Sequence, residues 1–286
     1  MTGVPAGFRE ARAFGRSAEI RTVIAPVAPI WRDRHRSARD RELVFGEDFR
    51  LEGEEDGLAF GRADRDGYPG FVDAAALSER AITPTDRIAV CRSYALISPE
   101  PLLDPLRAGV EVLPLSFGAR VRCVSASIRG WVEIDPGRPA PRGFDGQVYA
   151  YAPRIHMAEL LPASDPVAVA ELFLGTPYLW GGNSAFGIDC SGLVQIACLA
   201  CGIPCPGDSH QQEAELGETL ADPTDLRSGD LIFWAGHVAW VADNGRILHA
   251  NAHHMAVVFE DRAAAVARIE GQGGGPVTAL KRLGTR

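Results

Sequence analysis

Short apolar runs, each bounded by glycine, proline or aspartate, follow one another along the first half of the chain without a helical period. Such runs predict β-strands, and the glycine and proline between them predict turns. A first set lies within residues 21–83 and a second within residues 84–152. The expected strands are 23–31, 42–45, 48–54, 57–63 and 68–74, then 87–98, 110–117, 119–126, 130–135 and 147–152. We therefore expect two small all-β barrels after a loosely ordered lead-in at residues 1–20.

The pattern changes after position 152. Residues 154–174 show a helical spacing of apolar positions that Pro162 and Pro166 interrupt. The apolar run that begins after Asp189 can stay helical as far as Gly202. Strand patterns then return at 230–234, 237–243, 246–251 and 256–260. This succession predicts an α+β domain over residues 153–286.

The charge of the chain limits the partners that it can bind. Its 286 residues carry a formal net charge of −8 at pH 7, without a basic run. Nucleic-acid binding depends on clustered lysine and arginine, so we expect no nucleic-acid partner. Residues 1–22 lack the apolar core of a secretory signal, and no stretch reaches the roughly 18 apolar residues of a membrane helix. We expect a cytoplasmic protein without membrane insertion; its oligomeric state stays open, with a monomer as the working assumption.

Six cysteines stand at positions 91, 123, 190, 198, 201 and 205. In a chain of this length without an export signal, we expect free thiols rather than disulfides. Cys198 and Cys201 lie in or just after a run that is apolar almost all round, as in a buried helix. These two residues are therefore expected to be buried, unreactive thiols rather than metal ligands.

Cys190 differs from the other cysteines because it follows a predicted helix N-cap. Asp189 is a favoured N-cap residue, so Cys190 would fall in the first helical turn. Unpaired backbone N–H groups and the positive end of the helix dipole stabilise a thiolate there, and could also bind an oxyanion. A nucleophilic thiolate is one interpretation. The alternative, another buried cysteine, is disfavoured by the polar neighbours Asp189 and Ser191.

The turn Asn244-Gly245 predicts a hairpin whose register decides where two histidines point. A two-residue loop would place His237 and His249 on opposite faces of the sheet. A three-residue loop with Gly245 left-handed would pair Ala242 with Arg246, which makes His237 and His249 diagonal neighbours on one face. In that register one imidazole can accept the proton of Cys190 while the other orients the first.

Other hypotheses for the histidines stay open. Without the cysteine, two ordinary strand histidines would explain the pattern equally well. His253 and His254 could compete as the third member, although a place near a turn predicts surface residues. A zinc site is a further hypothesis, but Cys198 and Cys201 are expected to be buried, unreactive thiols rather than metal ligands. We therefore expect neither a metal nor an organic cofactor.

Four ordered motifs over residues 177–260 resemble the NlpC/P60 cysteine peptidases: YLWGG, DCSGLV, SGDLIFW and GHVAWVADNGRILHA. The resemblance implies a papain-like domain. Carried over to this chain, it assigns Cys190 as the nucleophile, His237 as the general base and His249 as the orienting residue. It also assigns Tyr178 to the oxyanion site, together with the backbone of Cys190. Further family positions correspond to substrate contacts by Asp189 and Ser191, and by Asp208 and Ser209. The last pair could equally cap the next helix, expected at 211–216.

The two β segments resemble bacterial SH3-like domains, on DFRLEGEEDGLAFGRADRDGYPGFVDAAAL and GARVRCVSASIRGWVEID. This arrangement is similar to the subgroup that cuts free murein peptides between γ-D-glutamate and a diamino acid during cell-wall recycling. The resemblance implies that the first SH3-like domain reads the amine of an N-terminal L-alanine, with Glu47 and Tyr68 as candidates. An amidase or acyltransferase of the same fold, and a non-catalytic protein that binds wall peptides, are the alternative functions.

Overall fold

The computed structural model describes residues 19–102, 104–105, 111–138 and 146–284. The chain divides into two compact units, residues 1–161 and 162–286. Most of the predicted lead-in, residues 1–18, lies outside the described residues. Its last two residues, Glu19 and Ile20, instead begin a strand.

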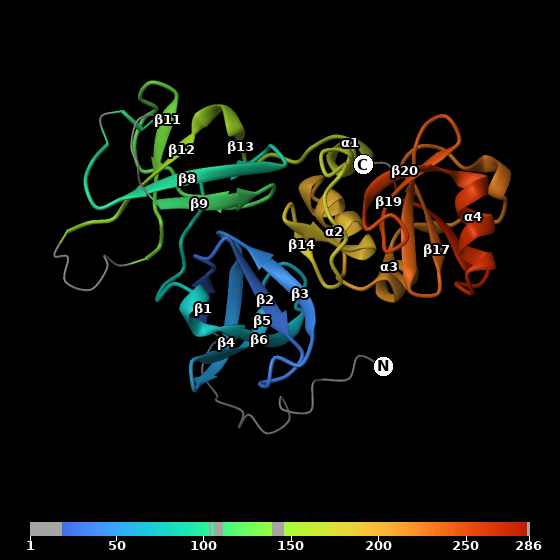
Figure 1. Ribbon diagram of the computed structural model, residues 1–286, viewed down its shortest axis with the longest axis horizontal. Coiled ribbons are helices and arrows are strands. Elements are labelled where there is room, and N and C mark those ends of the chain that lie inside the picture. The colour runs from blue at the N-terminus through green and yellow to red at the C-terminus, as the bar shows by residue number, and fades with distance from the viewer. Residues whose placement is uncertain (1–18, 103, 106–110, 139–145, 285–286) are drawn as a thin grey trace. The chain divides into compact units, whose positions relative to one another are not determined.

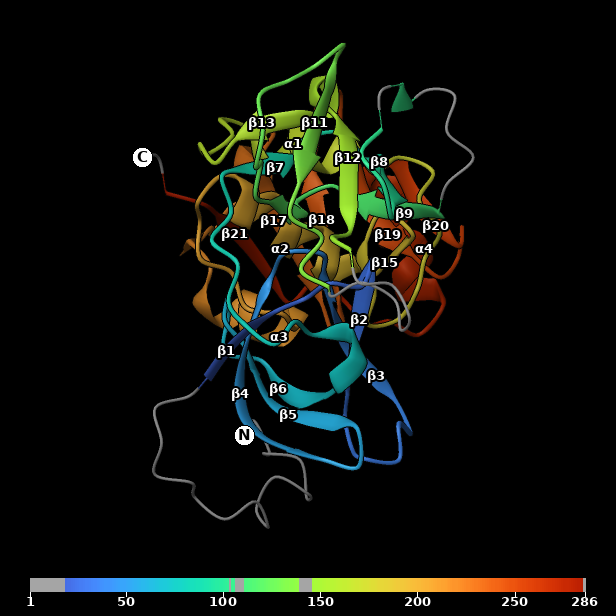
Figure 2. The same ribbon diagram turned by 90° about the vertical axis from the view of Figure 1, so that its left-hand side faces the viewer.

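The first part of unit 1 is one antiparallel sheet in the spatial order β1-β4-β5-β6-β2-β3 (Figure 2). Its strands are β1 (Glu19–Thr22), β2 (Val27–Trp31), β3 (Arg39–Val44), β4 (Asp48–Glu55), β5 (Leu58–Ala63) and β6 (Pro69–Asp73). Alternate residues such as Ala28 and Ile30 on β2 are buried, in keeping with the two-residue period of a strand. The five predicted strands are confirmed, and β1 was not expected.

The second part of unit 1 divides its strands between two small sheets, β10-β7-β13 and β11-β12-β8-β9. The strands are β7 (Asp86–Ile88), β8 (Arg92–Ser98), β9 (Glu111–Ser116), β10 (Arg120–Val121), β11 (Trp131–Ile134), β12 (Tyr149–Pro153) and β13 (Met157–Glu159). The run 87–98, expected as one strand, is two strands that pair with different partners. Because β13 pairs with β7, the chain just after residue 153 belongs to unit 1.

The expectation of closed barrels is wrong for the strands that the structure describes. The first sheet ends in β1 and β3, which pair with β4 and β2 rather than with each other. Pro26 precedes β2 and has no N–H group to donate to a strand ladder. In the second part, the break between β7 and β8 sends consecutive segments into separate sheets.

Unit 2 contains one larger antiparallel sheet in the order β16-β21-β17-β18-β19-β20, with a β14-β15 hairpin beside it. The strands are β14 (Asn183–Ser184), β15 (Gly187–Ile188), β16 (Glu218–Thr219), β17 (Asp230–Trp234), β18 (His237–Val241), β19 (Arg246–Asn251), β20 (Ala256–Asp261) and β21 (Ala279–Arg282). The helices are α1 (Pro166–Glu171), α2 (Cys190–Ala200), α3 (Ser209–Glu215) and α4 (Arg262–Gly271). The four predicted strands, β17 to β20, are confirmed.

The helical spacing over 154–174 overstates the helix that forms. Only α1 is α-helical there, with Pro166 as its first residue and Asp165 as its N-cap. Residues 154–159 form a 3₁₀ turn and β13 instead. Proline fixes its own backbone angle and disfavours helix in the residue before it, so a helix can begin at Pro166 but cannot run through it.

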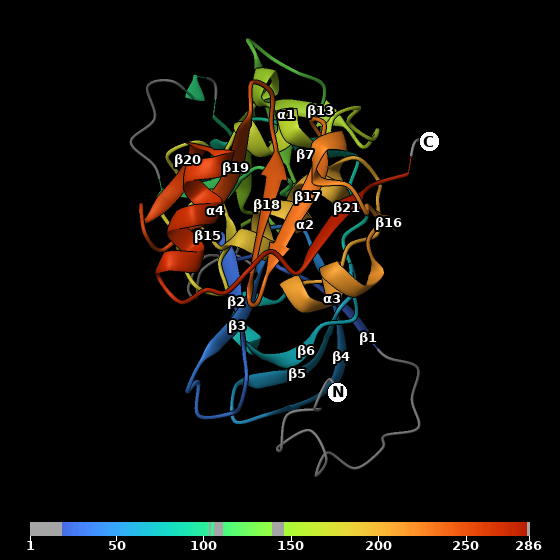
Figure 3. The same ribbon diagram turned by 90° about the vertical axis from the view of Figure 1, so that its right-hand side faces the viewer.

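Helices α2 and α4 lie on opposite faces of the unit 2 sheet (Figures 1 and 3). Ala265 and Ile269 of α4 pack against a core that includes Ile232, Ala239 and Ile247 of the sheet. Helix α2 packs against β18 and β19. Within the described part of the chain, no helix is long and apolar enough to cross a membrane.

Candidate active site

Cys190 is the first residue of α2, as the sequence predicts. Its N-cap is Asp189, whose Oδ1 accepts a hydrogen bond from the backbone N–H of Gly192 at 2.6 Å. Cys190 is only 7% exposed, so the expectation that its polar neighbours oppose burial is wrong. The chain before α2 folds back here, and the second carboxylate oxygen of Asp189 accepts from the N–H of Gly181 at 3.0 Å.

The loop before Cys190 is joined by backbone contacts to one end of the large sheet. Tyr178 donates its N–H to the carbonyl of Met255 at 2.9 Å, and Pro177 bridges to Ala256 at the start of β20. In the same segment, the carbonyl of Pro177 accepts a hydrogen bond from the backbone N–H of Ile188 at 3.0 Å. The loop that leads into α2 is therefore held where β19 ends and β20 begins.

The hairpin β18-β19 has the three-residue loop and the register that place both histidines on one face. Trp240 pairs with Leu248, and the N–H of Ala242 donates to the carbonyl of Arg246 at 2.9 Å. Both Asn244 and Gly245 adopt the left-handed conformation, with φ of 59° and 69°. The predicted register is confirmed, with Asn244 as a second left-handed residue that was not expected.

Two histidines, a carboxylate and a guanidinium form one hydrogen-bonded chain. His237 Nε2 lies 2.9 Å from His249 Nδ1, and His249 Nε2 lies 3.1 Å from Glu260 Oε2. Arg268 on α4 donates from Nε to Glu260 Oε1 at 2.9 Å and from its terminal nitrogen to Oε2 at 2.6 Å. His249 is only 1% exposed. The contact between the histidines supports a pair in which one imidazole orients the other.

Burial and the neighbouring charges shift the acidity of these groups. Burial, followed by the fields of His249 and Arg268, lowers the pKa of His237 to about 3. Burial also lowers the pKa of His249 to about 4, although the Glu260 carboxylate opposes this shift. The hydrogen bonds from Arg268 are the largest cause that lowers the pKa of Glu260 to about 2. At neutral pH the pair is therefore uncharged, beside an ionised carboxylate.

Comparison with known protein families agrees with this arrangement. Residues 175–266 match the NlpC/P60 family, and residues 32–77 match the bacterial dipeptidyl-peptidase SH3 domain. The chain carries an NlpC/P60 domain. That domain contains α2, the β18-β19 hairpin and Glu260, and the SH3 match covers most of the first sheet of unit 1.

Curated relatives match about a third of the chain. A γ-D-glutamyl-L-lysine dipeptidyl-peptidase of Bacillus cereus is 36% identical over 31% of this chain, and one of Bacillus subtilis is 38% identical over 31%. These alignments span 28% and 32% of the relatives' own length. A crystal structure of an NlpC/P60 family protein from Bacillus cereus covers 92% of this chain and 99% of its own, with a TM-score of 0.73 and 18% identity. The last likeness establishes the fold.

The other predicted residues of the NlpC/P60 domain lie around the start of α2. Tyr178 is half-buried in the loop described above. Ser191 is buried and donates from Oγ to Asp189 Oδ1 at 3.1 Å. Asp208 is the N-cap of α3, without a side-chain capping bond, and α3 begins at Ser209 rather than at 211. Roles in binding substrate stay predictions for all of these residues.

Glu47 and Tyr68, the predicted readers of a substrate amine, belong to unit 1. Glu47 is buried, and its carboxylate accepts from the N–H of Val44 at 2.8 Å and from Arg65 at 2.8 and 3.0 Å. Tyr68 packs against the core of the first sheet, with the Arg41 guanidinium 5.8 Å from the centre of its ring. Any contact of Glu47 with a ligand amine would have to share a carboxylate that Arg65 already binds.

Sequence reasoning missed Glu260, Arg268 and Gln212. Gln212 is fully buried and donates from Nε2 to the carbonyls of Ser191 and Pro206, both at 2.9 Å, so it joins α3 to the first turn of α2. Glu260 could have been suspected, because it follows the apolar run 256–259 at an alternate position from Val258, which pairs with His249. Arg268 had no such signal, because its position depends on where α4 packs.

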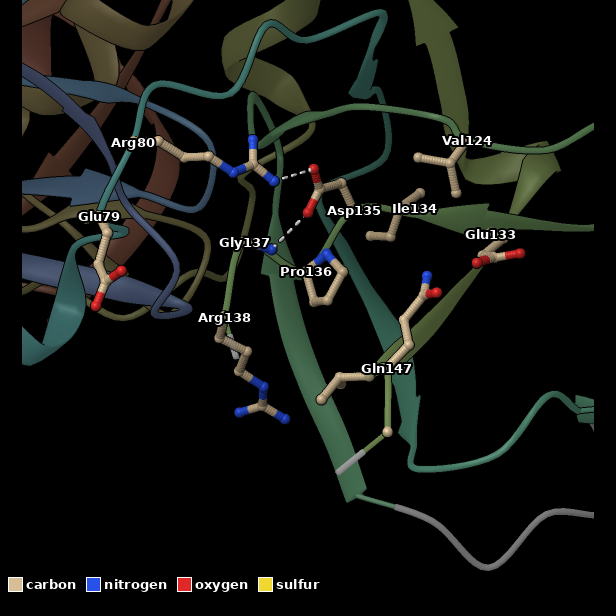
Figure 4. A pocket seen from close by; sticks show the side chains of 12 residues that line it. Glu79, Arg80, Val124, Glu133, Ile134, Asp135, Pro136, Gly137, Arg138 and Gln147 are labelled. Atoms are coloured by element: carbon tan, nitrogen blue, oxygen red, sulfur yellow. Dashed lines mark hydrogen bonds and ion pairs between the residues drawn. The ribbon is translucent and has the colours of Figure 1, made fainter. Parts of the chain in front are cut away.

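The remaining cysteines and histidines form no second site among the described residues. All six cysteines are free thiols; Cys198 and Cys201 are buried as predicted, and Cys205 is buried as well. His253 and His254 are exposed, also as predicted. No group of three or more histidine, cysteine, aspartate or glutamate side chains in the described part could hold a metal ion. A hollow of about 520 Å³ in unit 1 (Figure 4), lined by charged side chains such as Arg80 and Asp135, includes none of the predicted site residues.

Proposed function

We propose that this protein is a cysteine peptidase of murein-derived peptides, with Cys190 as nucleophile and His237 as base. The observation that carries the proposal is the 2.9 Å contact between His237 and His249, in an NlpC/P60 domain whose α2 begins at the candidate nucleophile. His237 begins β18, beside the end of the antiparallel strand β19, and the loop that leads into Cys190 is held at that same end of the sheet, so the two residues would meet there.

The proposed reaction is acyl transfer through a thioester. His237 takes the proton of Cys190, and the thiolate attacks the γ-glutamyl carbonyl carbon. The backbone N–H of Cys190 and the hydroxyl of Tyr178 bind the oxyanion, and protonated His237 gives its proton to the leaving amine. Water then attacks the thioester, with His237 again as base, and releases the acid. His249 holds the imidazole of His237 in place, and the cycle requires no metal or organic cofactor.

The proposed substrate is a free peptide, cut between γ-D-glutamate and the diamino acid that follows. The names of the Bacillus relatives, γ-D-glutamyl-L-lysine dipeptidyl-peptidases, support cleavage of this bond, and the match to a dipeptidyl-peptidase SH3 domain supports the same type of enzyme. A role in recycling such peptides, and a place in the cytoplasm, follow from this proposal. The acid that the reaction releases would be the L-alanyl-γ-D-glutamate dipeptide.

Mass spectrometry of the products from an L-Ala-γ-D-Glu-diaminopimelate peptide tests the proposed bond. The expected products are the dipeptide and the released diamino acid, with no turnover by the Cys190→Ala variant. A peptide that binds but stays intact would favour the alternative function, a non-catalytic protein that binds wall peptides. Transfer of the acyl group to an added amine, with little hydrolysis, would favour an acyltransferase.

Acetylation of the substrate's alanine nitrogen tests whether its amine is read. The loss of a charge-assisted contact should lower kcat/KM by about ten- to a hundredfold. If Glu47 makes this contact, the Glu47→Gln variant should cleave free and acetylated peptides at similar rates, while the exposed control Glu52→Gln keeps the preference. Equal cleavage of both peptides by the wild type, or ready digestion of intact sacculi, would refute the recycling assignment.

A further inference from the structure

Glu260 and Arg268 are held together next to His249 in a way that differs from an ordinary surface ion pair. Arg268 makes two hydrogen bonds to the Glu260 carboxylate, at 2.9 and 2.6 Å. The two side chains are only 14% and 18% exposed. Glu260 Oε2 is hydrogen-bonded to both Arg268 and His249, so this one oxygen links the guanidinium to the histidine pair.

This geometry determines which nitrogen of His249 carries a proton. An ionised carboxylate can only accept hydrogen bonds, so His249 Nε2, 3.1 Å from Glu260 Oε2, must be the donor. The arginine pairing lowers the pKa of Glu260 to about 2, which keeps the carboxylate ionised. In a neutral imidazole the other nitrogen then has a lone pair. His249 Nδ1 is therefore an acceptor.

The next hydrogen bond determines the tautomer of His237 in the same way. Since His249 Nδ1 accepts, His237 Nε2 must donate across the 2.9 Å contact. A neutral His237 with its proton on Nε2 has its basic lone pair on Nδ1. The nitrogen of His237 that can take a proton from a thiol is thus set by the Glu260 carboxylate, two hydrogen bonds away.

We propose that Glu260, fixed by Arg268, is a positioning residue that sets the tautomers of His249 and His237 and so places the basic nitrogen of the pair. Its catalytic meaning rests on the proposed function, whereas the tautomer assignment does not. Arg268 holds Glu260 in place and prevents its protonation. The Arg282–Asp230 pair of the same unit, at 2.7 Å, is a comparable ion pair without a histidine hydrogen-bonded to it.

Nitrogen chemical shifts of the seven histidines test the assignment in the full-length protein. In ¹⁵N-labelled wild type at neutral pH, with resonances assigned by single histidine substitutions, both His237 and His249 should carry their proton on Nε2. The Glu260→Ala variant should move the His249 proton partly or wholly to Nδ1, because the side chain that required a donor is gone. The matched control Glu270→Ala, an exposed carboxylate on α4, should leave all shifts unchanged.

The wild-type spectrum alone can overturn the proposal: a His249 proton on Nδ1 contradicts it, whether or not any variant folds. Unchanged tautomers in a folded Glu260→Ala variant contradict it as well. In the peptide-cleavage assay, Glu260→Ala should lose about ten- to a hundredfold in kcat with KM unchanged, since Glu260 is proposed to act through His249 rather than on the substrate. A wild type that cleaves no murein peptide would refute the proposed function, while the chemical shifts still decide the tautomers.

Discussion

Burial alone does not distinguish the candidate nucleophile from the other thiols of unit 2. Cys190, Cys198, Cys201 and Cys205 are all buried, but Cys190 is the residue that opens α2, where backbone N–H groups have no intrahelical acceptor. Cys198 lies within the body of the same helix, and Cys201 is its C-cap. The reactivity of each thiol should therefore depend on the position of its cysteine along the helix rather than on its exposure to solvent.

Replacement of Cys190 by alanine should abolish turnover without unfolding the protein. The thiolate is required for the covalent step, and its loss removes one sulfur atom at a helix start. Residual activity above about a hundredth of wild type would contradict a nucleophilic role. The matched control Cys198→Ala should keep its activity and lose about 1 kcal/mol of unfolding free energy, measured by urea denaturation.

The two histidines should differ in the size of their effects on catalysis. His237→Ala removes the proposed base, whereas His249→Ala removes the residue proposed to orient it, so His249→Ala should keep the higher kcat. Steady-state kinetics on the same peptide would show this order. Equal losses, or a larger loss for His249→Ala, would mean that the two roles are exchanged.

The ends of individual helices and strands position the residues of the candidate active site. Helix α2 supplies its first turn, and the hairpin β18-β19 supplies a register that brings two side chains to one face. The hairpin depends on its three-residue loop, because a shift by one residue would turn His249 to the other face. Gly245, with φ of 69°, is the residue of that loop best suited to a left-handed backbone.

Gly245→Ala should therefore destabilise the protein by about 1 kcal/mol, through backbone strain in the loop. The space around Gly245 is open, so a clash of the new methyl group is not the cause. Gly271→Ala is the control: it ends α4, has equally open surroundings and no left-handed backbone, and should be neutral or stabilising by up to about 1 kcal/mol. Urea titrations of both variants measure the difference. Equal effects would show that the loop tolerates another conformation.

The two units contribute different kinds of stability to the whole molecule. Unit 1 consists of sheets packed on apolar cores, one of which includes Phe45, in the turn after β3, together with Ile88 and Leu115. In unit 2 the sheet packs on α2 and α4, and it also buries His249 and half-buries its uncharged partner His237. Acid should therefore affect unit 2 through groups that must take up protons when the chain unfolds.

The unfolding free energy should fall as the pH drops below about 6.5. His237 and His249 have folded pKa values lowered to about 3 and 4, so the unfolded chain binds more protons in this window. Their contribution is complete above 6.5 and is lost as the pH falls toward those values, with a slope of at most about 1.4 kcal/mol per pH unit for each histidine. Glu260, lowered to about 2, adds a loss in the same direction below about 4.5.

Urea denaturation at a series of pH values, for wild type and for the double variant His237→Gln/His249→Gln, measures this linkage. The double variant should lose most of the slope between about pH 6.5 and 4. His253→Gln, which removes an exposed histidine, should keep it. The same slope in all three proteins would place the responsible groups elsewhere.

Local patterns were sufficient for the parts of this protein that depend on neighbouring residues. The strands β2 to β6 and β17 to β20, the helix that starts at Cys190 and the shared face of His237 and His249 could all be predicted. Each follows from a periodicity, a cap or a turn within a few residues, where backbone sterics and local hydrogen bonds decide the outcome. The helical spacing over 154–174, which the prolines interrupt, yields only the short helix α1, because proline can begin a helix but cannot continue one.

Only the tertiary structure decided the features that join distant segments. Whether the strands of unit 1 close into barrels depends on which edges meet, and no local pattern encodes that choice. Cys190 is buried although its neighbours in the sequence are polar, because burial depends on the segments that pack around a residue. The carboxylate that directs the histidines depends on the β19-β20 register and on α4, which packs Arg268 against Glu260. The chemical character of each side chain could be predicted from the sequence, but packing in the folded protein determined which side chains contact one another.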